Sequence, residues 1–225
     1  MHASFPLEIV RGHLLIGFPE GPALLDTGSP FDIGRGRGFT LFGDERRPPH
    51  LRREVLNVAS TQLGVHVEWL VGTPTLSHCC LILDVPNGRA VFRDDSVAAD
   101  GANQLSVNLE AGVPFIKIIT ARGREREDAV LDSGAPLSYV PQDEVVGMKP
   151  YRVADDFHPS TGEYRTPVYR VSVVIASRAL ELDAGILPPE LKEAFGDVWI
   201  IGSDYFAGRV ITLDYPSGRI LDAAR

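Results

Sequence analysis

The sequence predicts an all-β protein that consists of two related halves. Three observations support this fold class: short apolar segments bounded by glycine or proline recur along the chain, stretches with a helical period are few, and two pairs of motifs repeat in the same order. With 225 residues, of which 44% are hydrophobic, the chain is long enough to bury one large core or two smaller ones.

The expected strands alternate with turn residues throughout the chain. In the first half they cover residues 7–10, 13–18, 22–26, 39–42, 79–85 and 89–92, and in the second half residues 113–120, 128–132, 168–176 and 209–215. Short helices are expected only near residues 51–58 and 189–195. The charged segment 122–128 is expected to form a solvated turn between two strands.

An internal repeat divides the chain. The segment 69–89 recurs as 199–219, with each matched position offset by 130, and both copies begin with Trp-apolar-apolar-Gly. A second pair, Leu-Asp-Thr-Gly-Ser-Pro at 25–30 and Leu-Asp-Ser-Gly-Ala-Pro at 131–136, is offset by 106 and lies upstream of the first pair in both halves. We therefore expect an N-terminal lobe at 1–95, a linker at 96–112 and a C-terminal lobe at 113–225.

The repeat places one aspartate in the same context in each half. Asp26 and Asp132 both follow an apolar run, so each should lie where a buried strand ends and a turn begins. Lobes related by a pseudo-twofold axis would bring the two turns face to face. Two carboxylates held about 3 Å apart cannot both ionise, so the pair would share a proton and provide a base and an acid at the same pH.

The residues that follow the two aspartates fit such an arrangement. Gly28 and Gly134 permit a tight turn and a close approach of the backbone, because glycine has no Cβ. The hydroxyls of Thr27 and Ser133 can form hydrogen bonds across to the other half.

These motifs resemble those of the pepsin-like and retroviral-type aspartic proteases. In that family each lobe contains apolar-apolar-Asp-Thr/Ser-Gly and, later, apolar-apolar-Gly, which here are 24–28 with 70–72 and 130–134 with 200–202. The resemblance spans nearly the whole chain. It implies a bilobal β-barrel fold with two pseudo-twofold-related lobes and short helices, in a small bacterial-type form with a reduced first-lobe flap.

The resemblance also implies an activity and a role for each site residue. Asp26 and Asp132 would bind and activate a water that attacks a peptide carbonyl, one as base and the other as acid, so the chain would be an aspartic endopeptidase. Thr27 and Ser133 would brace the two loops. Gly28 and Gly134 would offer backbone N–H groups to the carboxylates.

The two loops differ in one hydroxyl. Ser29 and Ala135 occupy equivalent places, and only Ser29 can donate a side-chain hydrogen bond to its aspartate. Because fewer donors stabilise the doubly ionised pair less, we expect a raised upper pKa and an activity optimum nearer neutral than that of pepsin.

The sequence departs from the family in the first half. Asp26 and Gly72 are 46 residues apart, whereas Asp132 and Gly202 are 70 apart, and no tyrosine occurs before Tyr139. The family's first-lobe flap usually has a tyrosine near its tip. The candidate flap at 38–49 has no tyrosine, is short and has a charged tip. The second half contains a better hairpin at 151–169, with its turn at 158–162. Either that hairpin is the lid or the cleft is open.

Three functions therefore stay open. The chain could be an active peptidase, a catalytically weak or inactive protease-like module that binds a peptide or protein, or an all-β protein whose Asp-Thr/Ser-Gly turns are structural. Retention of both aspartates favours the first over the second, and the missing tyrosine-bearing flap favours the reverse.

Charge and composition limit the partners. A net charge of −8 without a basic cluster argues against nucleic acid, and the absence of an apolar run of about 18 residues argues against a membrane span. We expect a monomer that acts on a peptide or protein substrate, in the cytoplasm or as a mature form without its leader, and that needs no cofactor. The histidines lack ligand spacing, so no metal site is expected. The adjacent Cys79 and Cys80 are expected to be buried, reduced thiols.

Overall fold

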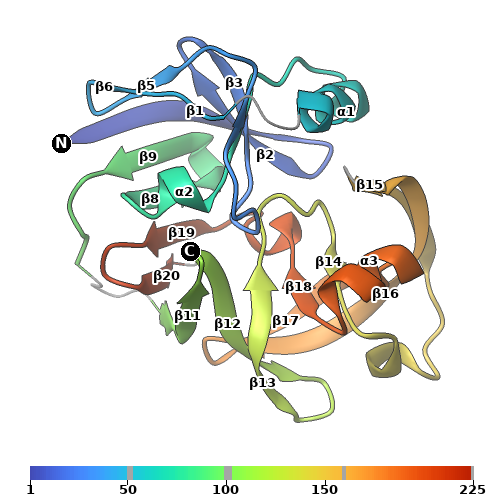
Figure 1. Cartoon of the computed structure of the whole chain (residues 1–225). Helices are drawn as coiled ribbons and strands as arrows, with labels where there is room; N and C mark the ends of the chain where they lie inside the picture. Colours follow the sequence, from blue (N-terminus) through green and yellow to red (C-terminus); the bar gives the residue numbers. More distant parts are fainter. Residues whose placement is uncertain (50–52, 99–102, 159–160, 224–225) are drawn as a thin grey trace.

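The structure, a computed structural model, describes residues 1–49, 53–98, 103–158 and 161–223. Strands make up most of its regular structure and helices are few, as the sequence predicts. Figure 1 shows the first half in blue to green in the upper part and most of the second half in green to red in the lower part.

A ten-stranded sheet has the order β10-β20-β19-β8-β9-β1-β2-β3-β7-β4. Its strands are β1 (His2–Val10), β2 (His13–Phe18), β3 (Gly21–Leu25), β4 (Ile33–Gly34), β7 (Trp69–Val71), β8 (Cys80–Asp84), β9 (Arg89–Arg93), β10 (Asn103–Leu105), β19 (Val210–Asp214) and β20 (Arg219–Ala223). Because β19 pairs with β8, the end of the chain is hydrogen-bonded to strands of the first half, as Figure 1 shows.

The second sheet has eight strands in the order β11-β12-β13-β18-β14-β17-β16-β15. Its strands are β11 (Val107–Glu110), β12 (Val113–Thr120), β13 (Glu125–Leu131), β14 (Ser138–Tyr139), β15 (Arg152–His158), β16 (Gly162–Ile175), β17 (Arg178–Gly185) and β18 (Trp199–Ile201). A separate hairpin consists of β5 (Phe39–Leu41) and β6 (Asp44–Arg46).

The helices are short. They are α1 (Arg53–Leu63), α2 (Thr73–Leu76) and α3 (Pro189–Phe195), with 3-10 turns at Val85–Asn87, Gln142–Val145 and Ser203–Tyr205. The prediction at 189–195 is confirmed. The helix expected at 51–58 continues to residue 63, because Leu56, Ala59 and Leu63 bury one helical face, and its expected start lies outside the described residues. The four-residue α2 was not predicted.

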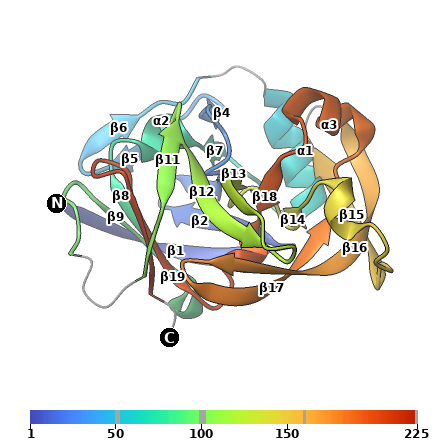
Figure 2. The same ribbon diagram turned by 90° about the horizontal axis from the view of Figure 1, so that it is seen from below.

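The two halves repeat one strand arrangement. In the first, β3 runs parallel to β7, with Leu25 opposite Val71, and in the second β13 runs parallel to β18, with Leu131 opposite Ile201. Helices α1 and α3, which precede β7 and β18 respectively, lie on the same side of the molecule in Figures 1 and 2.

A third repeated pair, which sequence analysis missed, lies at the starts of the halves. Arg11 and Gly12 join β1 to β2 with φ angles of 48° and 84°, and Ala111 and Gly112 join β11 to β12 with 49° and 82°. The two hairpins therefore have equivalent turns at an offset of 100.

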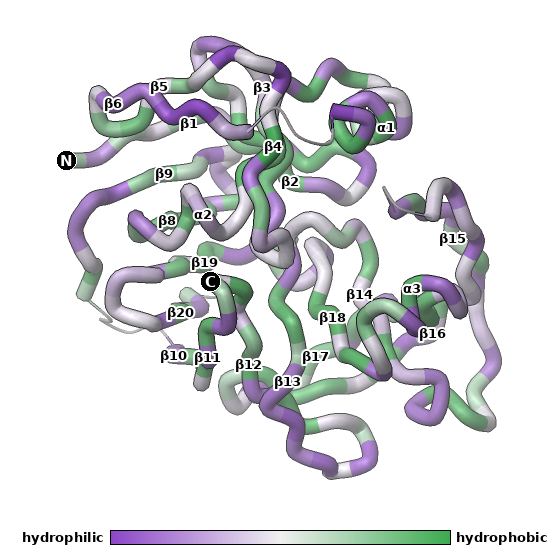
Figure 3. The backbone as a smooth tube through the Cα atoms, in the orientation of Figure 1, coloured by the Kyte–Doolittle hydropathy of each residue, from purple (hydrophilic) through white to green (hydrophobic). Residues whose placement is uncertain are grey.

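Two expected connections contain more strand than was predicted. The segment 96–112, expected as a linker, includes β10, which pairs with β20, and β11, which pairs with β12. The turn expected at 122–128 is shorter, because β13 begins at Glu125. Figure 3 shows the hydrophilic residues of this β12–β13 turn at one edge of the molecule.

The predicted core residues are buried. Trp69 and Trp199, which begin the repeated motif, have no exposed surface. Cys79 and Cys80 are buried free thiols, as predicted, and burial raises the pKa of Cys80 to about 11. In the described part of the chain, no helix is long and apolar enough to cross a membrane.

Candidate active site

Asp26 and Asp132 each lie one residue beyond the end of a central strand. The backbone N–H of Asp26 donates to the carbonyl of Val71 at 3.0 Å, and that of Asp132 donates to the carbonyl of Ile201 at 2.9 Å. These bonds continue the parallel β3–β7 and β13–β18 pairings by one residue, so each aspartate is held by two strands of its own half.

The two aspartates face each other across a pair of glycines. A Cβ placed on Gly28 would lie 2.5 Å from Cγ of Asp132, and a Cβ placed on Gly134 would lie 2.5 Å from Cγ of Asp26. No residue larger than glycine fits at either position. A hydrogen bond joins the two carboxyl groups, so they are close enough to share a proton.

Thr27 and Ser133 connect the two loops from behind. The Thr27 hydroxyl donates to the carbonyl of Leu131 at 2.7 Å and accepts the Ser133 N–H at 2.9 Å. In return, the Ser133 hydroxyl donates to the carbonyl of Leu25 at 3.0 Å and accepts the Thr27 N–H at 3.1 Å. Both side chains are completely buried. The expected hydrogen bonds across the two halves are therefore present in both directions.

The environment raises the pKa of both aspartates. Each is half-buried. Burial, followed by the negative charge of Asp132, raises the pKa of Asp26 well above its ordinary value. Burial also raises the pKa of Asp132, but this change is opposed by the N–H of Gly134, which lies 2.8 Å from Oδ1, and by a hydrogen bond from Asp26. Because both pKa values are raised and the two groups are coupled, the pair titrates as a unit.

The expectation for the Ser29 hydroxyl is wrong. It donates to the carbonyl of Phe31 at 2.9 Å and accepts the Phe31 N–H at 3.2 Å, because a serine at a turn satisfies its own local backbone first. The backbone N–H of Ser29 still lowers the pKa of Asp26, and that of Ala135 lowers the pKa of Asp132 in the same way. The predicted asymmetry between Ser29 and Ala135 thus has no basis in the side chains.

The loop of the first half is also held by Asp32, which sequence reasoning missed. Its Oδ1 accepts the N–H of Gly72 at 2.7 Å and its Oδ2 accepts the hydroxyl of Thr75 at 2.8 Å. Gly72 cannot be larger, because a Cβ there would lie 2.2 Å from the carbonyl oxygen of Phe31.

The second half contains an equivalent connection, in which a serine accepts the glycine N–H and an aspartate accepts the serine hydroxyl. The Ser138 hydroxyl accepts the N–H of Gly202 at 3.0 Å and donates to Asp204 at 2.8 Å. Asp32 and Ser138 are offset by 106, as the aspartates are, so extending the motif by six residues could have found this pair.

The short hairpin at 38–49 is part of the first-half core. Phe39 and Leu41 of β5 are buried, and the Phe39 ring centroid lies 4.5 Å from that of Phe18 and 5.4 Å from that of Trp69. These contacts tie the hairpin to its own half.

The predicted hairpin at 151–169 is present as β15 and β16, although residues 159 and 160 of its turn lie outside the described residues. It contacts the first half at two described points. Phe157 packs against the apolar cluster around Leu15 and Leu24, and the side-chain amide of Gln62 in α1 donates to Glu163.

Two tyrosines contact a buried carboxyl of the β15–β16 hairpin. The Tyr139 hydroxyl donates to the buried carboxyl of Asp156 and lies 2.8 Å from the Tyr164 hydroxyl, which is 3.3 Å from the same carboxyl. Burial raises the pKa of Asp156, hydrogen bonds with Tyr139, Tyr164 and the Phe157 N–H oppose this change, and the negative charge of Asp132 adds a smaller increase. The network therefore places a third carboxyl within electrostatic reach of the pair.

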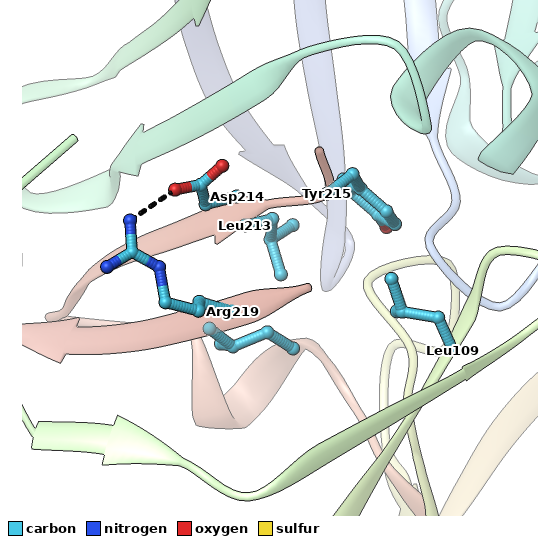
Figure 4. A pocket seen from close by; sticks show the side chains of 6 residues that line it. Leu109, Leu213, Asp214, Tyr215 and Arg219 are labelled. Atoms are coloured by element: carbon cyan, nitrogen blue, oxygen red, sulfur yellow. Dashed lines mark hydrogen bonds and ion pairs between the residues drawn. The ribbon is translucent and has the colours of Figure 1, made fainter. Parts of the chain in front are cut away.

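Figure 4 shows a hollow at the β19–β20 hairpin, away from these groups in sequence. It is lined by Leu109, Leu213, Asp214, Tyr215, Arg219 and Ile220, and Arg219 and Asp214 form an ion pair at 2.8 Å beside it. None of the predicted site residues lines it. Within the described residues, no three His, Cys, Asp or Glu side chains form a group that could hold a metal ion.

Comparison with known proteins adds no assignment: no protein-family model matches the chain, and neither does any curated protein.

Proposed function

We propose that the protein is an aspartic endopeptidase that hydrolyses peptide bonds with a water activated by Asp26 and Asp132. One observation supports this most strongly: the two carboxyls are hydrogen-bonded to each other at matching strand ends, each against the glycine that follows the other. A structural turn aspartate needs no second carboxyl beside it. Such closeness raises the free energy of the ionised pair, and it is useful where one group must accept a proton while the other donates one.

In the proposed mechanism one aspartate acts as base and the other as acid. We assign the base to Asp132, whose carboxylate accepts the N–H of Gly134 at 2.8 Å, and the acid to Asp26. Proton transfers of this kind contribute about 10²- to 10⁴-fold to a rate.

The reaction then follows from these two positions. As the oxygen of a water between the carboxyls attacks the peptide carbon, its proton passes to Asp132 and the Asp26 proton passes to the carbonyl oxygen. The tetrahedral intermediate breaks down when the proton on Asp132 is transferred to the leaving nitrogen and Asp26 recovers the hydroxyl proton. The C–N bond is then broken and the pair again holds one proton. These transfers require only carboxyls, water and substrate.

The test compares four proteins on one mixed peptide library: the wild type, Asp26→Asn, Asp132→Asn and the control Asp128→Asn. Asp128 is an aspartate whose carboxylate is ion-paired with Arg126 at 2.6 Å. We expect cleavage by the wild type and the control, loss of at least about 10³-fold in both dyad variants, and inhibition by a statine-type transition-state analogue. Equal cleavage by all four proteins would refute the proposal.

The binding module remains the second candidate, since the first-half hairpin is packed in the core and offers no separate flap. For such a module, no protein in the set would cleave, while the wild type would still retain peptides or the statine-type compound. Mass spectrometry of the incubated library and of the retained fraction distinguishes the two functions.

A further inference from the structure

Thr73 and Ser203 occupy equivalent places in the repeat, and both have a buried hydroxyl. Each directly follows the glycine of the Trp-apolar-apolar-Gly motif, and their exposed fractions are 2% and 3%. Each also lies against the aspartate loop of its own half, which is 26–30 in the first half and 132–136 in the second. Because a buried hydroxyl donates one hydrogen bond, its acceptor shows what the side chain holds.

The backbone of each residue is bonded to the aspartate loop of its own half. The N–H of Thr73 donates to the carbonyl of Ser29 at 2.9 Å, and the N–H of Ser203 donates to the carbonyl of Ala135 at 2.8 Å. Ser29 and Ala135 are equivalent positions, each three residues after an aspartate of the pair. Residues 73 and 203 are therefore attached to the far ends of the two aspartate loops.

The two hydroxyls cross to the opposite half. The hydroxyl of Thr73 donates to the carbonyl of Ala111 at 3.0 Å, and that of Ser203 donates to the carbonyl of Gly12. Ala111 lies in the β11–β12 turn and Gly12 in the equivalent β1–β2 turn. A chain of hydrogen bonds therefore runs from each aspartate loop to a turn of the other half, once in each direction.

Packing limits the same turns from the other side. A Cβ on Gly112 would lie 2.7 Å from Cβ of Thr73, and a Cβ on Gly12 would lie 2.7 Å from Cβ of Pro136, in the second aspartate loop. Neither turn can move closer, and the hydroxyl that each turn accepts opposes its moving away. The distance between each aspartate loop and the opposite half is therefore fixed in both directions.

These bonds add a second attachment to each aspartate loop. The hydroxyls of Thr27 and Ser133 hold the loops at their beginnings, directly after the aspartates. A loop that is held only at its beginning can still pivot about that point. Thr73 and Ser203 hold the other end, so each carboxyl is carried by a loop that is attached to the opposite half at two places.

We propose that Thr73 and Ser203 are positioning residues that hold the far ends of the aspartate loops against the opposite halves and so keep the Asp26 and Asp132 carboxyls together. Their effect on a rate rests on the proposed peptidase function, whereas their effect on the two carboxyls does not. Small displacements matter in such a site, because a shift of about 1 Å in a catalytic group can cost about a hundredfold in rate.

The first measurement uses the wild type and needs no activity. A buried hydroxyl proton that is donated to a carbonyl exchanges slowly with water, so both hydroxyls should give separate proton NMR signals. Nuclear Overhauser effects should join the hydroxyl proton of Thr73 to the α proton of Ala111, and that of Ser203 to the α protons of Gly12. Rapid exchange of either hydroxyl would overturn the proposal.

The second measurement follows the side-chain carboxyl ¹³C signals of the aspartate pair against pH in Thr73→Val, Ser203→Ala, Thr73→Ser and the control Ser60→Ala. The Ser60 hydroxyl donates to the carbonyl of Leu56 at 2.6 Å, so its bond stays within the first half. Carboxyls in contact titrate in two separated steps, since ionisation of one disfavours that of the other.

Loss of a hydroxyl that joins the halves should let the carboxyls move apart. In Thr73→Val and Ser203→Ala the two midpoints should therefore approach each other by about 0.5 pH. Thr73→Ser, which retains the hydroxyl, and Ser60→Ala should keep the wild-type separation. An unchanged separation in either Thr73→Val or Ser203→Ala would overturn the proposal.

Peptide cleavage then distinguishes this proposal from the proposed function. Thr73→Val and Ser203→Ala should lose about tenfold in kcat with little change in KM, while Thr73→Ser and Ser60→Ala should retain the wild-type kcat. An equal loss of kcat in Ser60→Ala and Ser203→Ala would show that lowered stability, and not position, reduces the rate, and would overturn the proposal.

The two proposals fail in different ways. A wild type that cleaves nothing, with midpoints that approach each other in Thr73→Val and Ser203→Ala, would remove the peptidase and leave the positioning role. An active wild type whose titration and kcat respond to neither substitution would remove the positioning role and leave the peptidase.

Discussion

Thr27 and Ser133 exchange hydrogen bonds across the two halves, each hydroxyl donating to the strand that leads to the other aspartate. The four bonds form a closed set, since each hydroxyl also accepts the other residue's backbone N–H. Loss of one hydroxyl leaves a buried N–H and a buried carbonyl of the opposite loop without a partner. The relative position of the aspartates therefore depends on side chains that touch neither carboxyl.

This relationship predicts strong coupling between the two residues. Thr27→Val and Ser133→Ala should each lower the free energy of unfolding by about 1–3 kcal/mol, because each leaves a buried N–H and a buried carbonyl without a hydrogen-bond partner. The double variant should cost less than their sum by about 1 kcal/mol or more, because loss of one hydroxyl lets the opposite loop shift and so weakens the bonds that the other hydroxyl makes. Urea unfolding measures all three. The control Thr61→Val removes an exposed hydroxyl of α1 and should change stability by less than about 0.5 kcal/mol. Additive losses would contradict the closed set.

The raised pKa of Asp26 predicts a stability that depends on pH. As pH rises above the ordinary carboxyl range, the unfolded chain releases this proton while the folded chain retains it. Folding therefore loses stability up to the folded pKa, by about 1.4 kcal/mol per pKa unit of difference. Asp26→Asn removes this loss, so it should unfold at a higher temperature than the wild type at pH 7, with a much smaller difference near pH 3.5.

The control for this experiment has the opposite sign. The Arg126 guanidinium lowers the pKa of Asp128, so Asp128→Asn should be slightly less stable than the wild type at pH 7 and equal to it at low pH. Calorimetry at several pH values checks both. If Asp26→Asn lowers the unfolding temperature at pH 7, the prediction that the Asp26 carboxyl destabilises the folded protein at that pH is wrong.

The site was predictable where its geometry is local and repeated. An apolar strand followed by Asp-Thr/Ser-Gly specifies a strand end, a hydroxyl and a close backbone approach within four residues, and its second copy indicates where the partner lies. The positions of Asp26, Thr27 and their counterparts follow from these motifs. The helix at 189–195 was predictable for a similar reason, since a proline starts it and a glycine follows it.

Features that depend on distant contacts were not predictable. Strand β10 forms because Leu105 pairs with Ile220, and nothing in its own three residues indicates a strand. The carbonyl of Gly12 accepts a hydrogen bond from Ser203, 191 residues further along the chain, so the sequence neighbours of Gly12 give no sign of this contact. The prediction for Ser29 failed for a different reason. Its hydroxyl has one proton to donate, and it donates to the nearby carbonyl of Phe31 and not to the Asp26 carboxyl.

Asp32 should respond differently to two substitutions. Asp32→Ala leaves the Gly72 N–H and the Thr75 hydroxyl without an acceptor, and the free energy of unfolding should fall by about 2–4 kcal/mol. Asp32→Asn retains an oxygen for Gly72, and its amide can donate to the Thr75 oxygen, so the loss should be about 1 kcal/mol or less. Ser138→Ala is the matched change in the second half and should resemble Asp32→Ala in direction. Denaturant unfolding decides the order, and equal losses for alanine and asparagine would show that the negative charge of Asp32, which both variants lack, is what stabilises the loop.

The two repeated tryptophans offer a matched comparison. Both are completely buried, but Nε1 of Trp69 donates to the carbonyl of Arg37 at 2.8 Å, whereas Nε1 of Trp199 has no partner among the described residues. Trp→Phe removes a similar apolar volume at each site. At Trp69 it also leaves a carbonyl unpaired, while at Trp199 it removes an unsatisfied donor. Trp69→Phe should therefore cost about 1–3 kcal/mol more than Trp199→Phe, measured by urea unfolding followed through circular dichroism. Equal or reversed costs would mean that packing volume, and not the indole N–H, determines how each half tolerates the change.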